Sequence, residues 1–524
     1  MYKEIQIRLT PEQAVDDMVC KKEISNVMEV SVSSITAFRP IKRSVDARKR
    51  QIMIQMTCAV WVDEEPEPQS LHLPGYNDVR NAPSVVVVGA GPGGFFAALR
   101  LIELGMRPVV IERGKDVSTR KVDLAQLQRS HVVDPESNYA FGEGGAGTYS
   151  DGKLYTRSTK RGDVRKVFEV FVHHGASEEI LVDTHPHIGT DKLPYVIKSM
   201  RETIIANGGE VRFETKMTDL ILEGDRVIGV LTSGGERLMG EAVILATGHS
   251  ARDVYYLLDE KSIALEAKTW AMGVRVEHPQ ELIDEIQYHS PEGRGEFLPA
   301  ASYSLTTQVD GRGVYSFCMC PGGFIVPAMT AAGEQVVNGM SPSLRNSPYA
   351  NSGIVVEVRP EDIGAFQNDG VVGGLKYQQE LERLAYINGG QGITAPAQAL
   401  ADFVDGRLSF ELPECSYVPG VMSSPMHFWM PDNIGQRLRK GFENFDKSAR
   451  GFVTNEALVV GVESRTSSPV RIPRDSETLE HIQIKGLYPC GEGAGYAGGI
   501  ASSAVDGELC AEKAVEAVKK RLQI

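Results

Sequence analysis

The stretch that decides the fold is SVVVV (84–88), followed by GAGPGG (89–94) and FFAALRLIEL (95–104). Consecutive valines predict a strand that is buried on both faces. The glycine run predicts a tight turn, and the apolar residues after it predict a helix that ends before Gly105. Pro108–Ile111 predicts the next strand, which leads to Glu112. The sequence therefore predicts a βαβ unit that binds a dinucleotide.

Each glycine of this motif, and the glutamate that follows it, has a physical role. Gly89 makes the tight turn, Gly91 lets the backbone approach a pyrophosphate, and Gly94 allows the helix to pack closely on the strand. The amides at the helix start face the phosphates. We expect the Glu112 carboxylate to accept hydrogen bonds from the adenosine ribose, which disfavours the 2′-phosphate of NADP at this site.

Two later segments distinguish FAD from NAD. Residues 209–248 predict short strands separated by turns and end in Ala-Thr-Gly, and residues 486–504 contain Gly491-Glu492 before a helix. In these features the chain resembles FAD-containing flavoproteins of the glutathione-reductase type. The resemblance implies that Glu492 contacts the ribityl or pyrophosphate part of FAD. It also implies that the helix start near Ile500 lies at flavin N1 and the C2 oxygen, where reduced flavin is anionic.

A third glycine cluster, Phe141–Leu154, resembles the loop that passes the flavin ring in these proteins. Together with Val462–Arg471 and Cys318–Gly323, it is similar to a narrower group of bacterial proteins described as FAD-dependent proteins or predicted FAD-dependent dehydrogenases. This resemblance covers nearly the whole chain and implies FAD as the cofactor, but it supplies no reaction. The residues expected to contact FAD are Gly89, Gly91, Pro92, Gly94, Glu112, Arg113, Gly145, Gly147, Lys153, Met217, Ala246, Thr247, Gly248, Gly491, Glu492, Gly499, Ile500 and Ala501.

The expected fold class is α/β, with a Rossmann-like FAD-binding domain of the three-layer ββα type, an inserted α+β cap and a small N-terminal α+β domain of ferredoxin-like plan. The expected boundaries are 1–80 for the N-terminal domain and linker, 81–264 and 461–524 for the FAD-binding domain, and 265–460 for the cap. Alternation over residues 52–62 predicts a strand, and Thr10–Gln13 predicts a helix start with proline at N1. In the cap, residues 270–276 and 353–358 predict strands, and residues 377–387 predict a helix.

Composition narrows the class of protein. A length of 524 residues predicts two or three domains, and 42% hydrophobic with 24% charged residues excludes wholesale disorder. The 55 basic and 69 acidic residues give a net charge of −14, which disfavours binding to nucleic acid or anionic membranes. Seven cysteines, a start without an apolar core and the lack of a long apolar run predict a soluble, cytoplasmic protein with no membrane partner.

The sequence offers several candidate catalytic residues but no complete catalytic motif. The catalytic candidates are His187, His249, Cys318, Cys320 and Arg465. His185, His187, His249 and His427 are potential general acids or bases, and His185 and His187 lack partners at zinc spacing, so no metal is predicted. A strand would place Cys318 and Cys320 on one face, where a thiol pair can relay electrons, although their spacing favours plain buried cysteines. Arg465 and Arg471 either bind a substrate carboxylate or phosphate or satisfy nearby carbonyls.

We predict an FAD-dependent oxidoreductase that acts on a small molecule by hydride transfer at flavin N5. No second GxGxxG follows residue 250, so NADH or NADPH would bind only transiently. The six basic residues between Arg39 and Arg50 motivate one alternative, a flavin-dependent RNA-modifying enzyme, although a solvated hairpin is the preferred interpretation. The other alternative is a non-catalytic FAD-binding protein whose N-terminal domain recruits a partner.

Overall fold

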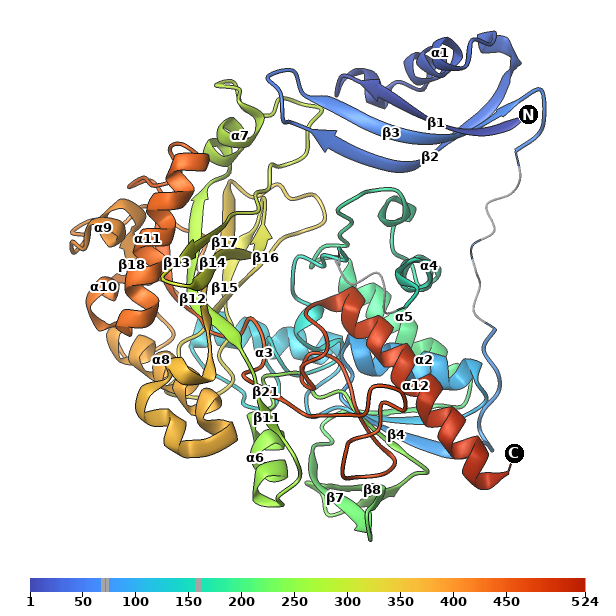
Figure 1. The fold of residues 1–524 in the computed structure, drawn as a ribbon, viewed down its shortest axis with the longest axis vertical. Coiled ribbons are helices and arrows are strands. Elements are labelled where there is room, and N and C mark those ends of the chain that lie inside the picture. Colours follow the sequence, from blue (N-terminus) through green and yellow to red (C-terminus); the bar gives the residue numbers. More distant parts are fainter. Residues whose placement is uncertain (67–70, 72–74, 156–161, 524) are drawn as a thin grey trace.

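The computed structural model describes residues 1–66, 71, 75–155 and 162–523. The chain forms three parts (Figure 1): an N-terminal domain, an α/β domain that contains both the glycine-rich turn and the C-terminal helix, and a cap. The cap is built from residues between the two halves of the α/β domain. No helix of the described chain is long and apolar enough to cross a membrane.

The α/β domain is built on a five-stranded parallel sheet with the order β22-β10-β4-β5-β6. Its strands are β4 (Ser84–Val88), β5 (Arg107–Ile111), β6 (Glu210–Arg212), β10 (Val243–Leu245) and β22 (Leu487–Pro489). Helix α2 (Pro92–Glu103) connects β4 to β5. The predicted βαβ unit and parallel sheet are confirmed.

The two faces of this sheet are covered differently, because successive side chains of a strand point to opposite faces. Val85 and Val87 pack with helices α2, α5 (Leu193–Ala206) and α12 (Ile500–Leu522). Val86 and Val88 pack with the antiparallel meander β7 (Met217–Glu223), β8 (Arg226–Thr232) and β9 (Arg237–Met239). The domain therefore has three layers, with helices on one face and a meander on the other. Its remaining helices are α3 (Val117–Ser130), α4 (Val164–His173) and α6 (Arg252–Glu260).

The cap centres on a seven-stranded sheet with the order β13-β14-β17-β12-β20-β18-β19. Its strands are β12 (Trp270–Pro279), β13 (Thr306–Val309), β14 (Arg312–Cys320), β17 (Tyr349–Val358), β18 (Ala395–Ala399), β19 (Val421–Ser423) and β20 (Leu458–Glu463). Its helices are α7 (Gln280–Tyr288), α8 (Gly373–Asn388), α9 (Leu400–Asp405), α10 (Met426–Trp429) and α11 (Asp432–Ser448). The predicted cap strands and helix are confirmed. The boundary expected at residue 460 falls inside β20, which stays in the cap sheet to Glu463.

Two short pairs of strands complete the cap region. Strands β15 (Phe324–Pro327) and β16 (Val337–Met340) form a hairpin. Strands β11 (Glu266–Ala267) and β21 (Val470–Arg471) pair where the chain enters and leaves the cap. Since this pairing joins the two crossover segments, it fixes the cap on the α/β domain at one point.

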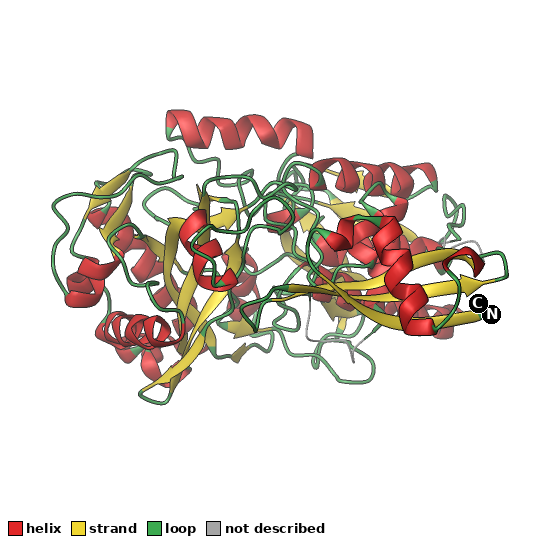
Figure 2. Ribbon diagram, turned by 90° about the horizontal axis from the view of Figure 1, so that it is seen from above, coloured by secondary structure: helices red, strands yellow, loops and turns green. Residues whose placement is uncertain are grey.

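The N-terminal domain is an antiparallel sheet of β1 (Tyr2–Leu9), β2 (Ile35–Asp46) and β3 (Met53–Val62), in the order β1-β3-β2, with helix α1 (Asp17–Met28). Figure 2 shows α1 lying over the sheet. The predicted strand over 52–62 is confirmed. The ferredoxin-like expectation is wrong for the described residues 1–62, because that plan needs a second helix and a fourth strand.

The helix of this domain also begins later than predicted. Thr10 and Gln13 exchange the two reciprocal hydrogen bonds of a capping box. However, they open only a single 3-10 turn, Gln13–Val15. Helix α1 begins at Asp17, because the Asp16 carboxylate accepts from the amides of Met18 and Val19 and caps the helix there.

Candidate functional site

The glycine-rich turn after β4 leaves no room for side chains. Gly89 has φ +105°, and a Cβ atom on it would lie 2.4 Å from the carbonyl oxygen of Ala246. A Cβ on Gly94 would lie 1.8 Å from the carbonyl oxygen of Gly89. The structure thus confirms the tight turn at Gly89 and the close packing of α2 on β4 at Gly94.

Four segments that are distant in sequence meet around this turn. A Cβ on Gly145 would lie 3.2 Å from Gly91 Cα, and one on Gly147 would lie 3.2 Å from Ile500. A Cβ on Gly493 would lie 2.7 Å from the Gly248 oxygen. The structure therefore brings the predicted cofactor segments 89–94, 145–147, 246–248, 491–493 and 499–501 together.

Two helices begin where these segments meet, so that their first backbone amides face the glycine-rich turn. Helix α2 follows Gly91, and α12 follows Gly499; in neither does a side chain of the preceding residue cap the helix. The first amides of a helix carry partial positive charge and bind anions when no side chain satisfies them. This cradle, formed by the glycine-rich turn and two helix starts without side-chain caps, fits a dinucleotide pyrophosphate.

The Glu112 carboxylate ties three loops to the end of β5. It accepts hydrogen bonds from the amides of Ala90, Gly114 and Gly142, each at 2.9 Å. A carboxylate has about four acceptor positions, so about one remains for a ribose hydroxyl. The sequence predicted the ribose contact but not this tie between the glycine turn and the 141–154 loop.

Glu492 lies beside His249. The His249 Nε2–H group donates to the Arg465 carbonyl at 2.9 Å, and His249 Nδ1 lies 3.2 Å from a Glu492 carboxylate oxygen. Both ring nitrogens of His249 therefore lie against protein atoms. This geometry argues against the predicted role of His249 as a free acid or base.

The predicted cofactor residues Arg113 and Met217 lie at the edge of this place. The Arg113 guanidinium contacts the carboxylates of Glu136 at 2.7 Å and Asp253 at 2.9 Å, and it lies over the Phe141 ring. Met217 is buried at the start of β7. Arg113 is therefore neutralised by the protein itself.

Sequence reasoning missed Asp506 and Arg474, which hold the Gly491-Glu492 segment. The Asp506 carboxylate accepts from the Gly491 amide at 2.7 Å and from Arg474 at 2.6 Å. Arg474 also donates to the Pro489 carbonyl at 2.6 Å. Cys490, Asp506 and Cys510 have ligand atoms within 4.8 Å of one another, but the Arg474 guanidinium already supplies a cation to them. The only hint of this arrangement in the sequence is Asp506 itself, an acidic residue among the small residues of α12.

The cap presents two thiols toward this region. A bulge between Phe317 and Cys320, with Cys318 at φ +49°, breaks the alternation of β14, so the predicted common face of Cys318 and Cys320 is wrong. Arg275 donates to the Cys318 carbonyl at 2.8 Å and pairs with Glu463 at 2.8 Å. Burial raises the pKa of Cys318 and raises the pKa of Cys320 to about 12, despite the nearby cations Arg275 and Lys153. Both remain thiols at neutral pH, which argues against an electron relay.

A charged cluster lies where the 141–154 loop meets the cap. Residues 151–154 pair with 186–189, with a bridge between Lys153 and His187. From the cap, Arg345 contacts the buried Asp151 carboxylate at 2.6 Å. His187 Nε2–H donates to the Ser343 carbonyl at 3.0 Å, which leaves Nδ1 unprotonated in the neutral ring. Burial and the charge of Arg345 lower the pKa of His187, so the ring is neutral at pH 7.

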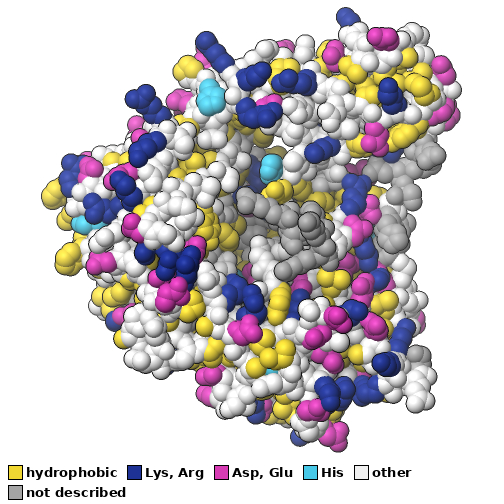
Figure 3. All heavy atoms as spheres, in the orientation of Figure 1, with side chains coloured by type: hydrophobic (Ala, Val, Ile, Leu, Met, Phe, Trp, Pro, Cys, Tyr) yellow, Lys and Arg dark blue, Asp and Glu magenta, His cyan; other side chains and the backbone are white. Residues whose placement is uncertain are grey.

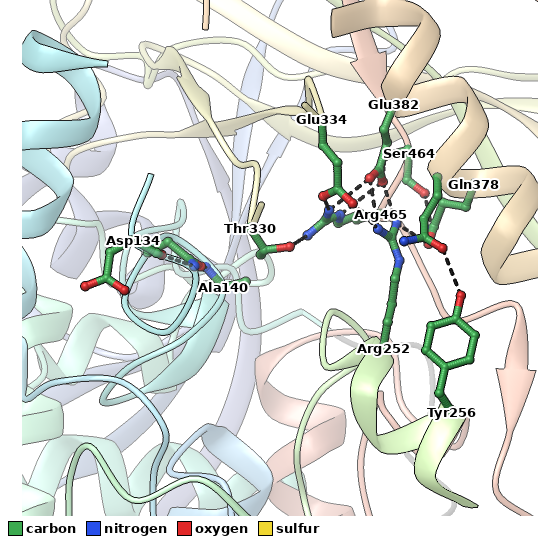
Figure 4. A network of polar contacts seen from close by, with 12 residues as sticks. Asp134, Ala140, Arg252, Tyr256, Thr330, Glu334, Gln378, Glu382, Ser464 and Arg465 are labelled. Atoms are coloured by element: carbon green, nitrogen blue, oxygen red, sulfur yellow. Dashed lines mark hydrogen bonds and ion pairs between the residues drawn. The ribbon is translucent and has the colours of Figure 1, made fainter. Parts of the chain in front are cut away.

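Arg465 does not face this cluster (Figure 4). Its guanidinium contacts Glu382 at 2.9 Å and Glu334 at 2.7 Å, and Arg252 from α6 reaches the same two carboxylates. Thr330, Gln378 and Ser464 add hydrogen bonds. These contacts argue against the alternative in which Arg465 holds a substrate anion, because the buried Glu382 and the half-buried Glu334 neutralise its guanidinium. Arg252 of α6 joins the same carboxylates, which links α6 to α8.

The other predicted polar residues lie elsewhere. His427 hydrogen-bonds to Gln398 on the cap at 3.0 Å, and Arg471 lies beside the Tyr496 ring. In the basic segment 39–50, two of the arginines are paired with carboxylates of the protein. Arg43 pairs with Asp183 at 2.8 Å, and Arg48 pairs with Asp46 at 2.8 Å. Figure 3 shows Lys and Arg side chains, in dark blue, on the face of the N-terminal domain that this view presents. A separate cavity of about 560 Å³ lies between the N-terminal domain and residues 165–182 and is lined by Arg39 and Trp61 among others.

Comparison with known protein families matches three parts of the chain. Residues 83–242 match an FAD binding domain, residues 269–466 match the family "FAD-dependent protein, C-terminal domain-like", and residues 1–61 match a domain of unknown function. A protein of Clostridium beijerinckii, called an uncharacterized protein, is 40% identical over 521 residues, which is 96% of each chain.

Solved structures with a similar arrangement are distant. A geranylgeranyl bacteriochlorophyll reductase-like protein from Thermoplasma acidophilum has a TM-score of 0.37 at 13% identity, covering 84% of this chain and 79% of its own. An oxidoreductase from Methanosarcina mazei has a TM-score of 0.33 at 11% identity, covering 82% and 100%. CtdE in complex with FAD has a TM-score of 0.31 at 10% identity, covering 84% and 89%. The family matches and the cradle, rather than these structures, identify the cofactor as FAD.

Proposed function

The chain is an FAD-binding flavoprotein of the same family as the Clostridium beijerinckii protein, and from this premise we propose that it is an oxidoreductase that acts on a small molecule bound between the cap and the α/β domain. Bound FAD supplies the hydride acceptor or donor at its N5 atom. Pockets at domain boundaries are the usual place for such substrates.

One observation carries this proposal: the cofactor cradle and the charged cluster are parts of one continuous loop. Residues 145–147 lie against both helix starts, and the same loop continues into Asp151, which pairs with Arg345 of the cap, and into Lys153, which bridges to His187. A substrate held at the cap would therefore lie beside the segment that resembles the flavin-passing loop of related proteins.

His187 is the residue that we assign to proton transfer. Its Nε2–H group is held by the Ser343 carbonyl, so its Nδ1 lone pair has a fixed direction. Because its pKa is lowered, this nitrogen is an unprotonated base at neutral pH. In this proposal Nδ1 accepts the proton that a substrate hydroxyl or amine releases when the neighbouring carbon is oxidised.

The test is anaerobic reduction of the purified holoprotein. NADH, NADPH and a panel of small alcohols, amines and organic acids are added in turn while the visible absorption band of oxidised flavin is followed. We expect at least one of these donors to bleach the band within minutes, whether a nicotinamide nucleotide binding transiently or the substrate itself. A flavin that dithionite reduces but that none of these donors reduces would contradict the proposal and favour a non-catalytic flavoprotein.

A further inference from the structure

Lys153 and Arg345 bring two positive charges to the junction of the α/β domain and the cap. Lys153 follows Asp151 on the loop from the cofactor cradle, and Arg345 lies between β16 and β17. In the part of the chain that the structure describes, no carboxylate lies at ion-pair distance from the Lys153 ammonium group. Two cations therefore share one acid, Asp151, which leaves a net charge of 2 − 1 = +1.

Arg345 is held in place with part of its binding capacity free. Its Nε and one Nη2 hydrogen contact the two Asp151 oxygens at 3.2 and 2.6 Å. A guanidinium has five N–H donors. Among the described residues nothing accepts a hydrogen bond from the remaining donors of Arg345, whose side chain is 14% exposed. Asp151 is buried, so it fixes the direction in which those donors point.

The two cations also affect the pKa values of the neighbouring histidines. Burial, Lys153 and Arg345 lower the pKa of His185, and burial and Arg345 lower the pKa of His187. Neutral histidines beside two cations leave the cluster positive at pH 7.

We propose that Lys153 and Arg345 bind the carboxylate of an organic-acid substrate. This inference rests on the proposed function, because it names the substrate class of the same site. A carboxylate matches the planar donors of a guanidinium, and Lys153 adds a point charge. A single net positive charge balances a monoanion, whereas a phosphate dianion would leave the site negative. His187 would then lie close to the carbon that bears the carboxylate or to its neighbour.

Binding of simple anions to the holoprotein tests this inference without turnover. Sodium benzoate is titrated at constant ionic strength, and the shift in the visible spectrum of bound flavin is recorded together with the heat of binding. Benzamide is the neutral control. Inorganic phosphate tests whether the site prefers a phosphate to a carboxylate. We expect saturable binding of benzoate, with benzamide and phosphate at least tenfold weaker.

Matched variants locate the site. Lys153→Gln and Arg345→Gln should each weaken benzoate binding about tenfold or more, since each removes a charged hydrogen-bond donor. Lys376→Gln and Arg383→Gln, which remove exposed, paired cations on α8, should change it less than twofold. If Arg345→Gln does not fold because Asp151 loses its partner, Lys153→Gln decides the question.

Three results would overturn the inference: no saturable benzoate binding, equal binding of benzamide or phosphate, or unchanged binding in the Lys153→Gln variant. These results are distinct from failure of the proposed function. Reduction of the flavin by a neutral donor without anion binding would reject the carboxylate site alone. Benzoate binding to a flavin that no donor reduces would reject the oxidoreductase alone.

Discussion

Gly94 is the residue at which the cofactor turn tolerates least change. A Cβ on it would lie 1.8 Å from the Gly89 carbonyl oxygen and 3.0 Å from its carbon, and both are backbone atoms at the end of a buried strand. Neither atom can move aside without opening the turn. Relief of the clash must therefore shift α2 away from β4, and with it the amides that face the pyrophosphate.

We predict that Gly94→Ala reduces the FAD content of the purified protein at least tenfold and costs about 1–3 kcal/mol of stability through overpacking. The measurement is flavin released by denaturation, per mole of chain. Gly234→Ala is the control, because a Cβ there would approach no atom closer than 3.8 Å. Full FAD content in Gly94→Ala would show that this turn does not hold the cofactor.

At this scale the sequence predicted the residues whose roles are local. Gly89 and Gly94 follow from one contiguous motif, and the turn and packing that it implies are present. Arg465 and His249 could not be assigned in the same way, because their partners are distant in sequence: Glu382 lies 83 positions from Arg465, and the Arg465 carbonyl lies 216 positions from His249. Only the folded chain shows that these side chains serve other protein groups.

At the scale of elements, helices α6 and α8 are joined by a charged network of Arg252, Arg465, Glu334 and Glu382. Glu382 is the centre of this network, since it contacts both arginines. The two arginines hold the pKa of the Glu382 carboxyl well below its usual range, against the effect of burial. Removing the Glu382 charge would leave two buried guanidiniums with Glu334 as their remaining carboxylate.

We predict that Glu382→Gln destabilises the cap by about 3–5 kcal/mol, since it breaks a buried network at one partner. For a domain of this size, that corresponds to a fall of about 6 °C or more in the thermal midpoint. Glu380→Gln on the same helix removes only a half-exposed pair with Arg383, so we expect a cost below about 1 kcal/mol. Equal midpoints for the two variants would contradict this account of the network.

Glu277 in β12 makes the cap sensitive to pH. Its buried carboxylate accepts hydrogen bonds from the amide and hydroxyl of Ser416, and burial raises its pKa from 4.5 to about 7. The folded protein therefore holds this proton more tightly than the unfolded chain does. The stabilisation is complete below pH 4.5 and is lost as the pH rises through 7, by about 3 kcal/mol in total.

Glu277→Gln keeps an acceptor for Ser416 and removes the titration. We predict that this variant gains stability relative to the unmodified protein between pH 5 and pH 8, by up to about 3 kcal/mol, and that the difference disappears at acid pH. Thermal midpoints across this range measure it, with the exposed Glu456→Gln as the control. A difference that does not change with pH would contradict the raised pKa.

The local sequence pattern predicted the elements with strong cores, such as β3, β12, β17 and α8, because apolar residues concentrate where an element is buried. It failed where neighbouring elements decide the geometry. The bulge at Cys318 depends on the register with β17, and α1 begins late because Asp16 caps it after the 3-10 turn that Thr10 and Gln13 open. Neither the register with β17 nor the choice between two caps can be read from one segment of sequence alone.

At the scale of the whole molecule, the N-terminal domain is fastened to the site. Strand β2 binds the segment after α4 through Arg43 and Val182 at 2.9 Å and through Thr184 and Arg43 at 3.0 Å. That segment continues directly into His185 and His187. The N-terminal domain therefore fixes the loop that carries the proposed base. Nothing in the sequence of either partner predicted this contact, because the two lie about 140 positions apart.

The convergence of the cofactor segments is the central claim, and the most direct measurement is the cofactor content of the purified full-length protein. Flavin released by denaturation is identified by chromatography and mass and is quantified against chain concentration, before and after incubation with added FAD. The account predicts FAD at about one molecule per chain. A chain that carries no flavin after incubation, or that binds FMN in place of FAD, would contradict it.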